Sequence, residues 1–338
     1  MSTVFVGLSG GVDSAVSAAL LKEQGYNVVG AFIKIWRPEF IDCPWQKDRL
    51  DAMRVCAALE ISFKEIDLSE EYKKTVIDDM VANYSRGITP NPDVLCNRHI
   101  KFGAFAKWAL SEGAQFVATG HYAQNVDGKL MRGKDANKDQ SYFLWQLTKD
   151  DLSRALFPVG GYTKPEVRAL AEKFGLPVAA KKDSQGLCFV GDITMRDFLA
   201  HYLPLKKGNV LDERGSVIGE HDGAALYTLG ERHGFRIQAE VPHFVVSTDV
   251  ATNTIIVSPN KVSAARSSVN LIHPNWFEEI TSKKYSAQAR YRETPVTCTV
   301  SGSKVAFDAA HLAPPGQSLV IYDGDNVVGG GVISTYTK

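Results

Sequence analysis

Strand-like and helix-like patterns alternate along the first half of the chain. Residues 3–9 form an apolar run typical of a buried strand, and residues 13–25 fit a helix that ends at Gly25. Further strand-like runs lie at 27–36, 62–68 and 114–120. Because strands that alternate with helices build a parallel sheet covered by helices, we expect ligands to bind at the carboxyl ends of these strands.

Three more helices are predicted from the spacing of apolar residues. In the first, at 48–59, one face holds Leu50, Met53, Cys56 and Ala57. In the second, at 100–110, one face holds Phe102, Phe105, Ala106 and Ala109. The third, at 163–174, begins with a T-x-x-E capping box from Thr163 to Glu166 and ends at Gly175.

The pattern changes after about residue 200. Short alternating runs separated by turn residues, at 208–223 and 245–260, predict β-hairpins. The same style continues from residue 262 to the end without a clear helix. We therefore predict an α/β fold in three parts: a doubly wound parallel-sheet domain at 1–198, a small β-rich central domain at 199–261 and a C-terminal β-barrel at 262–338.

Composition narrows the class of protein. Basic and acidic residues number 38 each, so the formal net charge is zero, whereas dedicated nucleic-acid binders are usually basic. A local basic groove would still suffice for RNA, because counterion release depends on the charges at the interface. No apolar run approaches the ~18 residues of a membrane span, so no membrane partner is expected. The chain enters its first strand almost at once, which leaves no room for a signal peptide and predicts a cytoplasmic protein.

The loop between the first strand and the first helix, GLSGGVDS, carries candidate phosphate-binding chemistry. Its glycines let backbone N–H groups turn toward an anion, and the helix start adds the positive end of its dipole. No lysine follows, so this is not the loop of kinases and GTPases. It resembles the SGGxDS loop of ATP pyrophosphatases, and the alternative is a glycine-rich turn capped by Asp13 or Ser14. We expect ATP, accompanied by Mg²⁺, to be cleaved between its α and β phosphates.

Two of the five cysteines are candidates for sulfur chemistry. Cys96 follows Asp93 in a D-x-x-C arrangement just before the helix predicted near Ile100, where a helix start would stabilise its thiolate. Cys188 lies in a glycine-bearing loop close to Lys181 and Lys182, which would favour its thiolate as well. Each cysteine alone is more often a small buried hydrophobe. Cys43, Cys56 and Cys298 are predicted to be structural, and the absence of a CxxC pair predicts reduced thiols and no metal site.

Long sequence blocks then place the chain near a known family. GLSGGVDS, TPNPDVLCN, ATGHYA, KDQSYFL, CFVGD, RYRET and YDGDNVVGGGVI resemble the tRNA-specific 2-thiouridylase family nearly from end to end. The resemblance implies an enzyme with an ATP-pyrophosphatase domain that adenylates the 2-carbonyl oxygen of the wobble uridine in tRNAs for Glu, Gln and Lys. A persulfide sulfur then displaces AMP to give 2-thiouridine. It also implies a cysteine desulfurase or a sulfur-relay protein as the partner that delivers sulfur.

The same resemblance assigns roles to individual residues. It implies that Cys96 is the thiol nucleophile, Cys188 the persulfide carrier and Asp93 the acid–base residue. The residues it implies for ATP binding are Gly7, Leu8, Ser9, Gly10, Gly11, Val12, Asp13, Ser14, Ile33 and Gly120. Those it implies for tRNA are Asn91, Pro92 and Asp93 beside the flipped base, with His121, Lys138, Asp139, Gln140, Arg290, Tyr291 and Gln317 elsewhere.

One departure and two alternatives accompany this interpretation. Where the family usually has a basic GQRKG-like turn, this chain has GERHGF, with Glu231 and His233, so no phosphate contact is assigned there. One alternative is an ATP-pyrophosphatase synthetase of the amidotransferase type, which uses ammonia and needs no pair of reactive cysteines. The other is a non-catalytic RNA-binding module that retains the loop and the cysteines without using them. Release of AMP and pyrophosphate on addition of tRNA separates the three.

Overall fold

The computed structural model describes residues 1–40, 45–182 and 193–335. Their contacts divide them into two compact units. Among the described residues, the first unit comprises 1–76, 93–182 and 325–328, and the second comprises 77–92, 193–324 and 329–335. This division differs from the three domains predicted from the sequence, whose boundaries stay a prediction.

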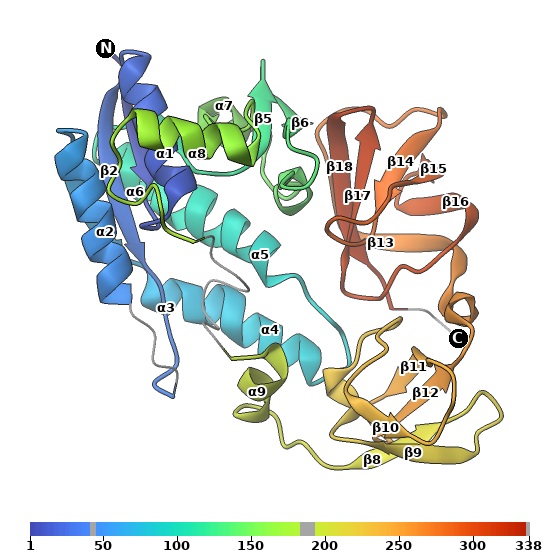
Figure 1. Cartoon of the computed structure of the whole chain (residues 1–338). Coiled ribbons are helices and arrows are strands. Elements are labelled where there is room, and N and C mark those ends of the chain that lie inside the picture. The colour runs from blue at the N-terminus through green and yellow to red at the C-terminus, as the bar shows by residue number, and fades with distance from the viewer. Residues whose placement is uncertain (41–44, 183–192, 336–338) are drawn as a thin grey trace. The chain divides into compact units, whose positions relative to one another are not determined.

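A parallel sheet forms the centre of the first unit (Figure 1). Its strand order is β3-β2-β1-β4-β7, and each neighbouring pair is parallel. The strands are β1 (Thr3–Gly7), β2 (Asn27–Lys34), β3 (Ser62–Asp67), β4 (Phe116–Ala118) and β7 (Ala155–Leu156). The strands expected at the start of the chain are therefore confirmed, and β1 occupies the middle of the sheet.

Helices cover both faces of this sheet, as side chains of β1 show. Val4 and Val6 belong to a buried cluster with residues of α1 (Val12–Glu23), α2 (Trp45–Ala58) and α8 (Lys164–Lys173). Phe5 points the other way and meets Trp108 of α6 (Phe105–Ser111) edge to face, with ring centroids 5.6 Å apart. Because successive side chains of a strand face opposite sides, this alternation confirms a doubly wound sheet.

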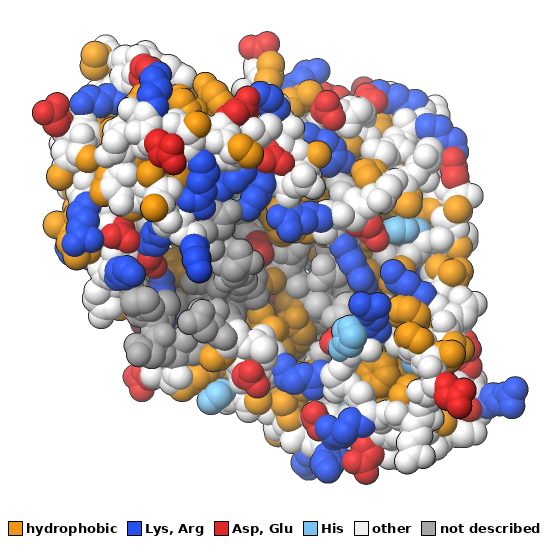
Figure 2. Space-filling view, viewed as in Figure 1, with side chains coloured by type: hydrophobic (Ala, Val, Ile, Leu, Met, Phe, Trp, Pro, Cys, Tyr) orange, Lys and Arg blue, Asp and Glu red, His pale blue; other side chains and the backbone are white. Residues whose placement is uncertain are grey.

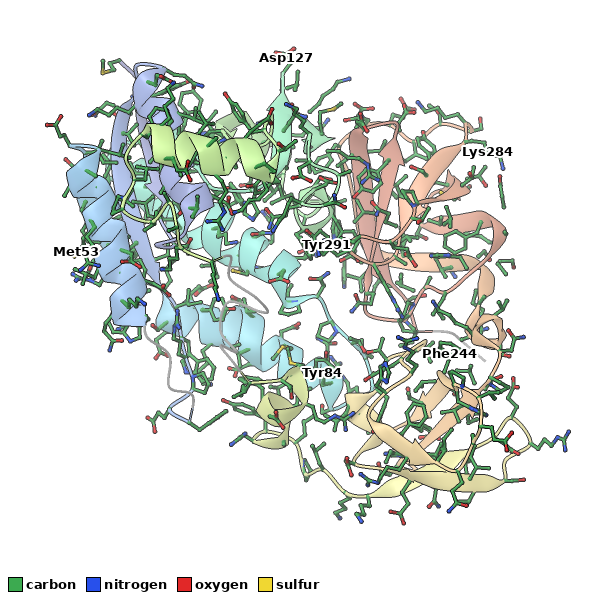
Figure 3. All side chains as sticks on the ribbon, in the orientation of Figure 1. Met53, Tyr84, Asp127, Phe244, Lys284 and Tyr291 are labelled. Carbon is green, nitrogen blue, oxygen red and sulfur yellow. The ribbon has the colours of Figure 1, made fainter. Side chains whose placement is uncertain are left out.

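The apolar face predicted for α2 is wrong by about one residue. Leu50 and Met53 are 44% and 37% exposed, and Met53 points outward in Figure 3. The buried residues are instead Ala52, Val55, Cys56 and the following Leu59, spaced at i, i+3, i+4 and i+7. Asp51 shares the buried face because its carboxylate is paired inside the protein, which periodicity of apolar residues could not reveal.

The helix expected near residue 100 begins earlier than predicted. α5 (Pro92–Leu95) runs directly into a π-helix, η2 (Cys96–Ala104), and then into α6. Proline is favoured at the first helical position, where its missing N–H costs nothing. Other helical elements are α3 (Ser69–Tyr72), η1 (Lys73–Ile77), α4 (Asp78–Tyr84), η3 (Ser141–Phe143) and α7 (Lys149–Arg154). The capping box of α8 is confirmed, since the Glu166 carboxylate accepts the Thr163 backbone N–H at 2.6 Å.

The second unit contains α9 (Met195–Ala200) and two β structures. A five-stranded sheet has the order β10-β9-β8-β12-β11. Its strands are β8 (Gly208–Leu211), β9 (Val217–His221), β10 (Phe235–Ile237), β11 (Phe244–Asp249) and β12 (Thr254–Ser258). Both predicted hairpins are confirmed, because β8 pairs with β9 and β11 with β12 in antiparallel fashion.

Six antiparallel strands then form a closed barrel. Their order is β13-β16-β15-β14-β17-β18, and pairing of β13 with β18 closes the ring. The strands are β13 (Arg266–Trp276), β14 (Tyr285–Gln288), β15 (Val296–Ser301), β16 (Lys304–His311), β17 (Ser318–Asp323) and β18 (Asn326–Ile333). A hairpin of β5 (Ala123–Val126) and β6 (Lys129–Arg132) belongs to the first unit. The predicted fold class, including the C-terminal barrel, is confirmed.

Candidate active site

The glycine-rich loop joins β1 to α1 at the carboxyl end of the sheet. Gly10 has φ +72°, and a Cβ placed on it would overlap the Asp48 carbonyl oxygen, so only glycine fits. The Ser9 backbone N–H donates to Ser14 Oγ at 3.2 Å, and that hydroxyl donates to the Gly11 carbonyl at 3.2 Å. These short-range bonds hold the loop in one compact turn.

The first helix begins without a side-chain cap. Gly11 is its N-cap residue, and no side chain accepts the N–H groups of its first turn in the described structure. By contrast, Thr148 caps α7, because its hydroxyl accepts the Asp151 N–H at 3.1 Å. Unsatisfied N–H groups and the positive end of the helix dipole make an anion site. Ser14 also bonds the backbone of the turn through its hydroxyl, so the alternative of a glycine-rich turn held by Ser14 stays open until ATP binding is measured.

The two ATP-binding residues predicted outside the loop both come to it. Gly120 follows β4, and a Cβ placed on it would lie 2.7 Å from the Ser14 backbone nitrogen. Ile33, on β2, has its Cδ1 atom 3.6 Å from the position of a Cβ on Gly7. The structure thus brings the end of β4 against the start of α1, and the end of β2 against the end of β1, where the loop begins.

Asp13 has two partners that the sequence did not indicate. The Tyr122 hydroxyl and the Lys164 ammonium both donate to its Oδ1 atom, each at 2.7 Å. Lys164 is the first residue of α8, and its ammonium also lies 5.9 Å from the centre of the Tyr122 ring. The negative charge of Asp13 at the anion site is therefore offset by a neighbouring cation.

Lys181 contacts the same loop from the other side. Its ammonium donates to the Gly10 carbonyl at 2.9 Å, to Asp48 at 2.9 Å and to Asp51 at 2.7 Å. Burial opposes the charge of Lys181, but the hydrogen bonds to Asp51 and Asp48 outweigh it and raise the Lys181 pKa. The sequence suggested that this lysine favours the thiolate of Cys188, whereas its described partners are two carboxylates and the loop.

Asp93 and Cys96 lie one turn apart at the start of the helix that begins with α5. Residues three apart on a helix are neighbours on its surface. Cys96 is 6% exposed. Asp93 is half-buried, and burial raises the pKa of its carboxyl while the charge of Lys101 opposes that rise. Cys96 is the fifth residue of a continuous helix that begins at Pro92, so the prediction that it lies just before a helix start is wrong. The helix start that was expected to stabilise its thiolate lies one turn before it, beside Asp93.

A buried histidine contacts Lys101. His121 is 7% exposed and packs against the rings of Phe102 and Phe157, which also contact each other. Burial, followed by the charge of Lys101, lowers the His121 pKa well below its ordinary value, so the ring is neutral. Its Nε2 atom lies 3.4 Å from the Lys101 ammonium, which can only donate, and its Nδ1 atom lies 2.7 Å from Thr119 Oγ1. The proton of the ring is therefore assigned to Nδ1.

The loop that contains Lys138, Asp139 and Gln140, which the resemblance implied for tRNA, is held by hydrogen bonds within the protein. Asp139 is 8% exposed, and its carboxylate accepts bonds from Arg132, Gly133 and Ser141 at 2.9 to 3.1 Å. The Gln140 side-chain oxygen accepts the Tyr122 N–H at 3.0 Å. Lys138 is half-buried. Asp139 thus holds the shape of the loop, and Gln140 ties the loop to the tyrosine that contacts Asp13.

In the second unit, Gln317 holds the segment that leads to Asn91 and Pro92. Its amide donates to the Thr89 carbonyl at 2.9 Å and to the Pro90 carbonyl at 3.1 Å. Thr89 also shares a hydrogen bond of 2.8 Å with Thr228. The Gln317 amide, which the family resemblance implied for tRNA, therefore donates to two backbone carbonyls of the protein.

Arg290 and Tyr291 follow β14 of the barrel. The Arg290 guanidinium donates to the Leu229 carbonyl, next to the turn that departs from the family pattern. In that turn Glu231 accepts the Thr228 N–H at 3.1 Å, and burial raises its pKa. Arg292 lies over the ring of Tyr291, with 5.0 Å from its guanidinium carbon to the ring centre (Figure 3 labels Tyr291). Glu231 thus stabilises the turn by a hydrogen bond within it. This fits the sequence analysis, which assigned no phosphate contact to the turn.

Cys56 and Cys298 are buried, and burial raises the pKa of each thiol to about 11. That shift fits the structural role predicted for them. Cys43 and Cys188 lie outside the described residues. Within the described ranges, no group of three His, Cys, Asp or Glu side chains is placed to hold a metal, and no helix is long and apolar enough to span a membrane.

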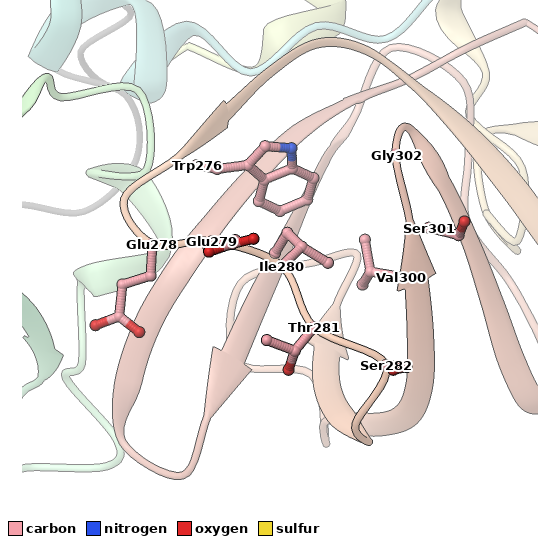
Figure 4. A pocket seen from close by; sticks show the side chains of 9 residues that line it. All are labelled: Trp276, Glu278, Glu279, Ile280, Thr281, Ser282, Val300, Ser301 and Gly302. Atoms are coloured by element: carbon pink, nitrogen blue, oxygen red, sulfur yellow. The ribbon is translucent and has the colours of Figure 1, made fainter.

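Two surface features involve other residues. A pocket of about 500 Å³ on the barrel has Trp276, Ile280 and Val300 among its lining residues (Figure 4). It contains none of the predicted site residues. On the face shown in Figure 2, Lys and Arg side chains are interspersed with Asp and Glu, as a net charge of zero suggests.

Three family models match successive parts of the chain. They are described as a tRNA methyl transferase HUP domain at residues 2–192, a tRNA methyl transferase PRC-barrel domain at 196–259 and an aminomethyltransferase beta-barrel domain at 266–333. The first alone spans more than half of the chain.

Full-length relatives carry a more specific description. The tRNA-specific 2-thiouridylase MnmA of Akkermansia muciniphila is 44% identical, with 98% of each chain covered. The protein of the same name from Thiobacillus denitrificans is 44% identical, with 98% of this chain and 100% of that chain covered. Among solved structures, the U34-tRNA thiolase NcsA of Methanococcus maripaludis is 21% identical with a TM-score of 0.38, covering 60% of this chain and 64% of that chain. That last likeness is too weak to support an argument.

Proposed function

The chain belongs to the tRNA-specific 2-thiouridylase family and is a tRNA-uridine 2-sulfurtransferase, and we propose how its residues divide the reaction. In the first step the 2-carbonyl oxygen of the wobble uridine attacks the α-phosphorus of ATP. The bond between the α and β phosphates breaks, pyrophosphate leaves, and the uridine carries AMP on its oxygen. In the second step sulfur replaces that oxygen, and AMP leaves. The substrates are the wobble uridines of tRNAs for Glu, Gln and Lys.

The observation that carries the proposal is the uncapped start of α1. Gly7 to Ser14 present backbone N–H groups at this helix start, and Gly120 approaches so closely that a side chain would not fit. Such a site suits the phosphates of ATP, which bring four negative charges or nearly so. Ile33 supplies an apolar contact beside the loop. Magnesium accompanies the phosphates, because Mg²⁺ prefers phosphate oxygens and water to all-protein cages.

The sulfur step uses Cys96 and Cys188. A persulfide on Cys188 attacks C2 of the adenylated uridine through its terminal sulfur, and AMP leaves with the oxygen. The Cys96 thiolate then attacks the inner sulfur of Cys188, which releases 2-thiouridine and leaves a disulfide between the two cysteines. An external thiol reductant must reduce that disulfide, and a cysteine desulfurase or a sulfur-relay protein must reload the persulfide. The position of Cys96 beside Asp93 supports its part in this scheme.

Asp93 moves the proton that activation of uridine requires. When O2 is adenylated, the ring nitrogen N3 loses its proton, and it regains one when the thione forms. A half-buried carboxyl with a raised pKa is suited to accept and return that proton. Lys101 stabilises the ionised form, and neutral His121 holds the Lys101 ammonium. We therefore assign His121 a positioning role in addition to the tRNA contact implied by the family.

Some of the residues implied for tRNA contact it directly, and others hold the segments that do. Asn91 and Pro92 flank the flipped base, while Lys138, Gln140, Arg290 and Tyr291 contact the anticodon stem-loop. Asp139 and Gln317 act through the segments they hold, since both carboxylate oxygens of Asp139 and both hydrogens of the Gln317 amide are used within the protein. Gln140 and Arg290 each use only part of their side chain in this way. The compartment is the cytoplasm, where reduced thiols and tRNA are both available.

The His121 assignment has its own test. His121→Gln keeps a neutral acceptor near Lys101, whereas His121→Leu removes it. We expect His121→Leu to lower kcat for thiolation at least tenfold with tRNA affinity nearly unchanged, the range for a perturbed acid–base group. His121→Gln should restore part of the rate. A loss of tRNA affinity without a loss of kcat would return His121 to tRNA contact alone.

The proposed function is tested with the full-length protein, unmodified tRNA, ATP, a thiol reductant, and a cysteine desulfurase supplied with free cysteine as the persulfide source. Mass spectrometry of the nucleosides should show 2-thiouridine, and AMP and pyrophosphate should be released only when tRNA is present. Cys96→Ser and Cys188→Ser should each abolish 2-thiouridine, while pyrophosphate release continues. A methylated or aminated nucleoside, or no AMP release, would overturn the proposal in favour of a methyltransferase, an amidotransferase-type synthetase or a non-catalytic module respectively.

A further inference from the structure

The peptide between Gly10 and Gly11 is the part of the phosphate loop with the least intrinsic restraint. Glycine occupies both sides of this peptide, so its plane can rotate at little steric cost. The peptide is trans, which means that its carbonyl and its N–H point in opposite directions. In one orientation the N–H faces the anion site, and in the flipped one the carbonyl oxygen does. The second orientation would place a partial negative charge toward phosphate.

Lys181 selects between these orientations. Its ammonium accepts no bond and can only donate, and one of its donors meets the Gly10 carbonyl at 2.9 Å. This holds the carbonyl on the side of Lys181 and turns the Gly11 N–H to the opposite side. A cation on a carbonyl also polarises the peptide and strengthens its N–H as a donor.

Two carboxylates of α2 hold the Lys181 ammonium in place. Asp48 and Asp51 each accept a bond from Lys181, at 2.9 and 2.7 Å, and Asp51 also pairs with Arg54 at 3.2 Å. The four charges cancel within the cluster. Lys181 is therefore not a spare cation for phosphate, and its effect on a bound nucleotide passes through the peptide that it orients.

We propose that Lys181 is a positioning residue for the ATP loop, which locks the Gly10–Gly11 peptide with its N–H toward the phosphates. This role rests on the proposed binding of ATP by the loop. It differs from the thiolate-stabilising role that the position of Lys181 in the sequence suggested. Lys182 offers a matched control, because it is the adjacent lysine and its side chain is exposed.

The experiment compares Lys181→Met with Lys182→Met in the full-length protein. Calorimetric titration with ATP should show affinity lowered about tenfold or more by Lys181→Met, the loss expected for one charge-assisted hydrogen bond at the site. Lys182→Met should bind ATP within about twofold of the unmodified chain, as expected for an exposed side chain. Lys181→Arg, which keeps the cation, should recover most of the affinity. Steady-state pyrophosphate release should show the change in KM for ATP, with kcat at saturating ATP much less affected.

Different failures are distinguishable. If the unmodified chain binds no ATP, the proposed function fails and this inference fails with it. If the unmodified chain binds ATP and Lys181→Met binds it equally well, only the role of Lys181 is overturned. A lower melting temperature with unchanged ATP affinity would mean that the ion pairs only stabilise the fold. Equal losses of sulfur transfer in both lysine variants, with normal ATP binding, would favour the thiolate role instead.

Discussion

Two helices of the first unit start in opposite ways. α8 begins with the Thr163–Glu166 capping box, in which the Glu166 carboxylate accepts the Thr163 backbone N–H. α1 begins with glycine and leaves its first N–H groups without a side-chain cap. A capping residue is worth about 1 kcal/mol, so the open start of α1 lowers stability in exchange for an anion site. The uncapped start of α1 lies at the proposed ATP loop, whereas the start of α8, with its capping box, carries none of the predicted site residues.

The strongest test of this comparison replaces a glycine beside each helix. Gly10→Ala should lower kcat/KM for ATP by more than about a hundredfold, because it combines positive φ with overlap on the Asp48 carbonyl. Gly175, just after α8, also has positive φ but has open space around its Cβ position. Gly175→Ala should cost about 1 kcal/mol of stability and leave ATP turnover unchanged. Pyrophosphate release and chemical denaturation measure the two effects.

A second test removes a polar side chain at each of the two helix starts. Asp13→Ala or Ser14→Ala should raise KM for ATP about tenfold or more with little change in tRNA affinity, as for loss of a polar contact at the site. Thr163→Ala should instead cost about 1 kcal/mol of stability with normal ATP kinetics. If Asp13→Ala and Ser14→Ala both left ATP turnover unchanged, the loop would be a structural turn.

A third test uses the residue that joins the two helices. Lys164 leads α8 and donates to Asp13 of α1. Lys164→Met leaves the capping box in place but exposes the phosphate site to the uncompensated charge of Asp13. We expect KM for ATP to rise by a factor of about three to ten, typical of one partly buried ion pair. The double variant with Asp13→Asn should regain affinity, and failure to do so would show that the two residues act separately.

The smallest expected effect is the pH dependence of the stability that Glu166 contributes at the start of α8. A hydrogen bond from Lys134, followed by the bonds from Thr163, lowers the Glu166 pKa from 4.5 to about 2. A carboxyl whose pKa falls on folding stabilises the protein above its unfolded pKa and loses that contribution as the pH falls toward its folded pKa. The difference in melting temperature between the unmodified chain and Glu166→Gln should therefore be present at pH 6 and shrink between about pH 4.5 and 2. A constant difference across that range would contradict the assignment.

Local patterns predicted much of this molecule, and distant pairings were out of reach. The loop, the capping box at Thr163 and the β-hairpins depend on residues that are neighbours in sequence, so spacing was enough to find them. The partners of Asp13 and Asp51 are Lys164 and Lys181, which stand 151 and 130 residues further along. Only the fold brings such residues together. The buried face of α2 was misjudged for the same reason, because a distant lysine makes burial of Asp51 favourable.

The π-helix η2 affects which side chains of the proposed active site lie on the same side of the helix. Its backbone rings close at the fifth residue instead of the fourth, so positions five apart come to the same side of the helix. Cys96 and Lys101 are five apart, whereas in an ordinary α-helix neighbours are three or four apart. The widened turn thus brings positions 96 and 101 closer to one side of the helix than an ordinary α-helical turn would. One shift of hydrogen-bond register would rotate Lys101 away from His121, so the choice between two kinds of helical turn controls which side chains meet.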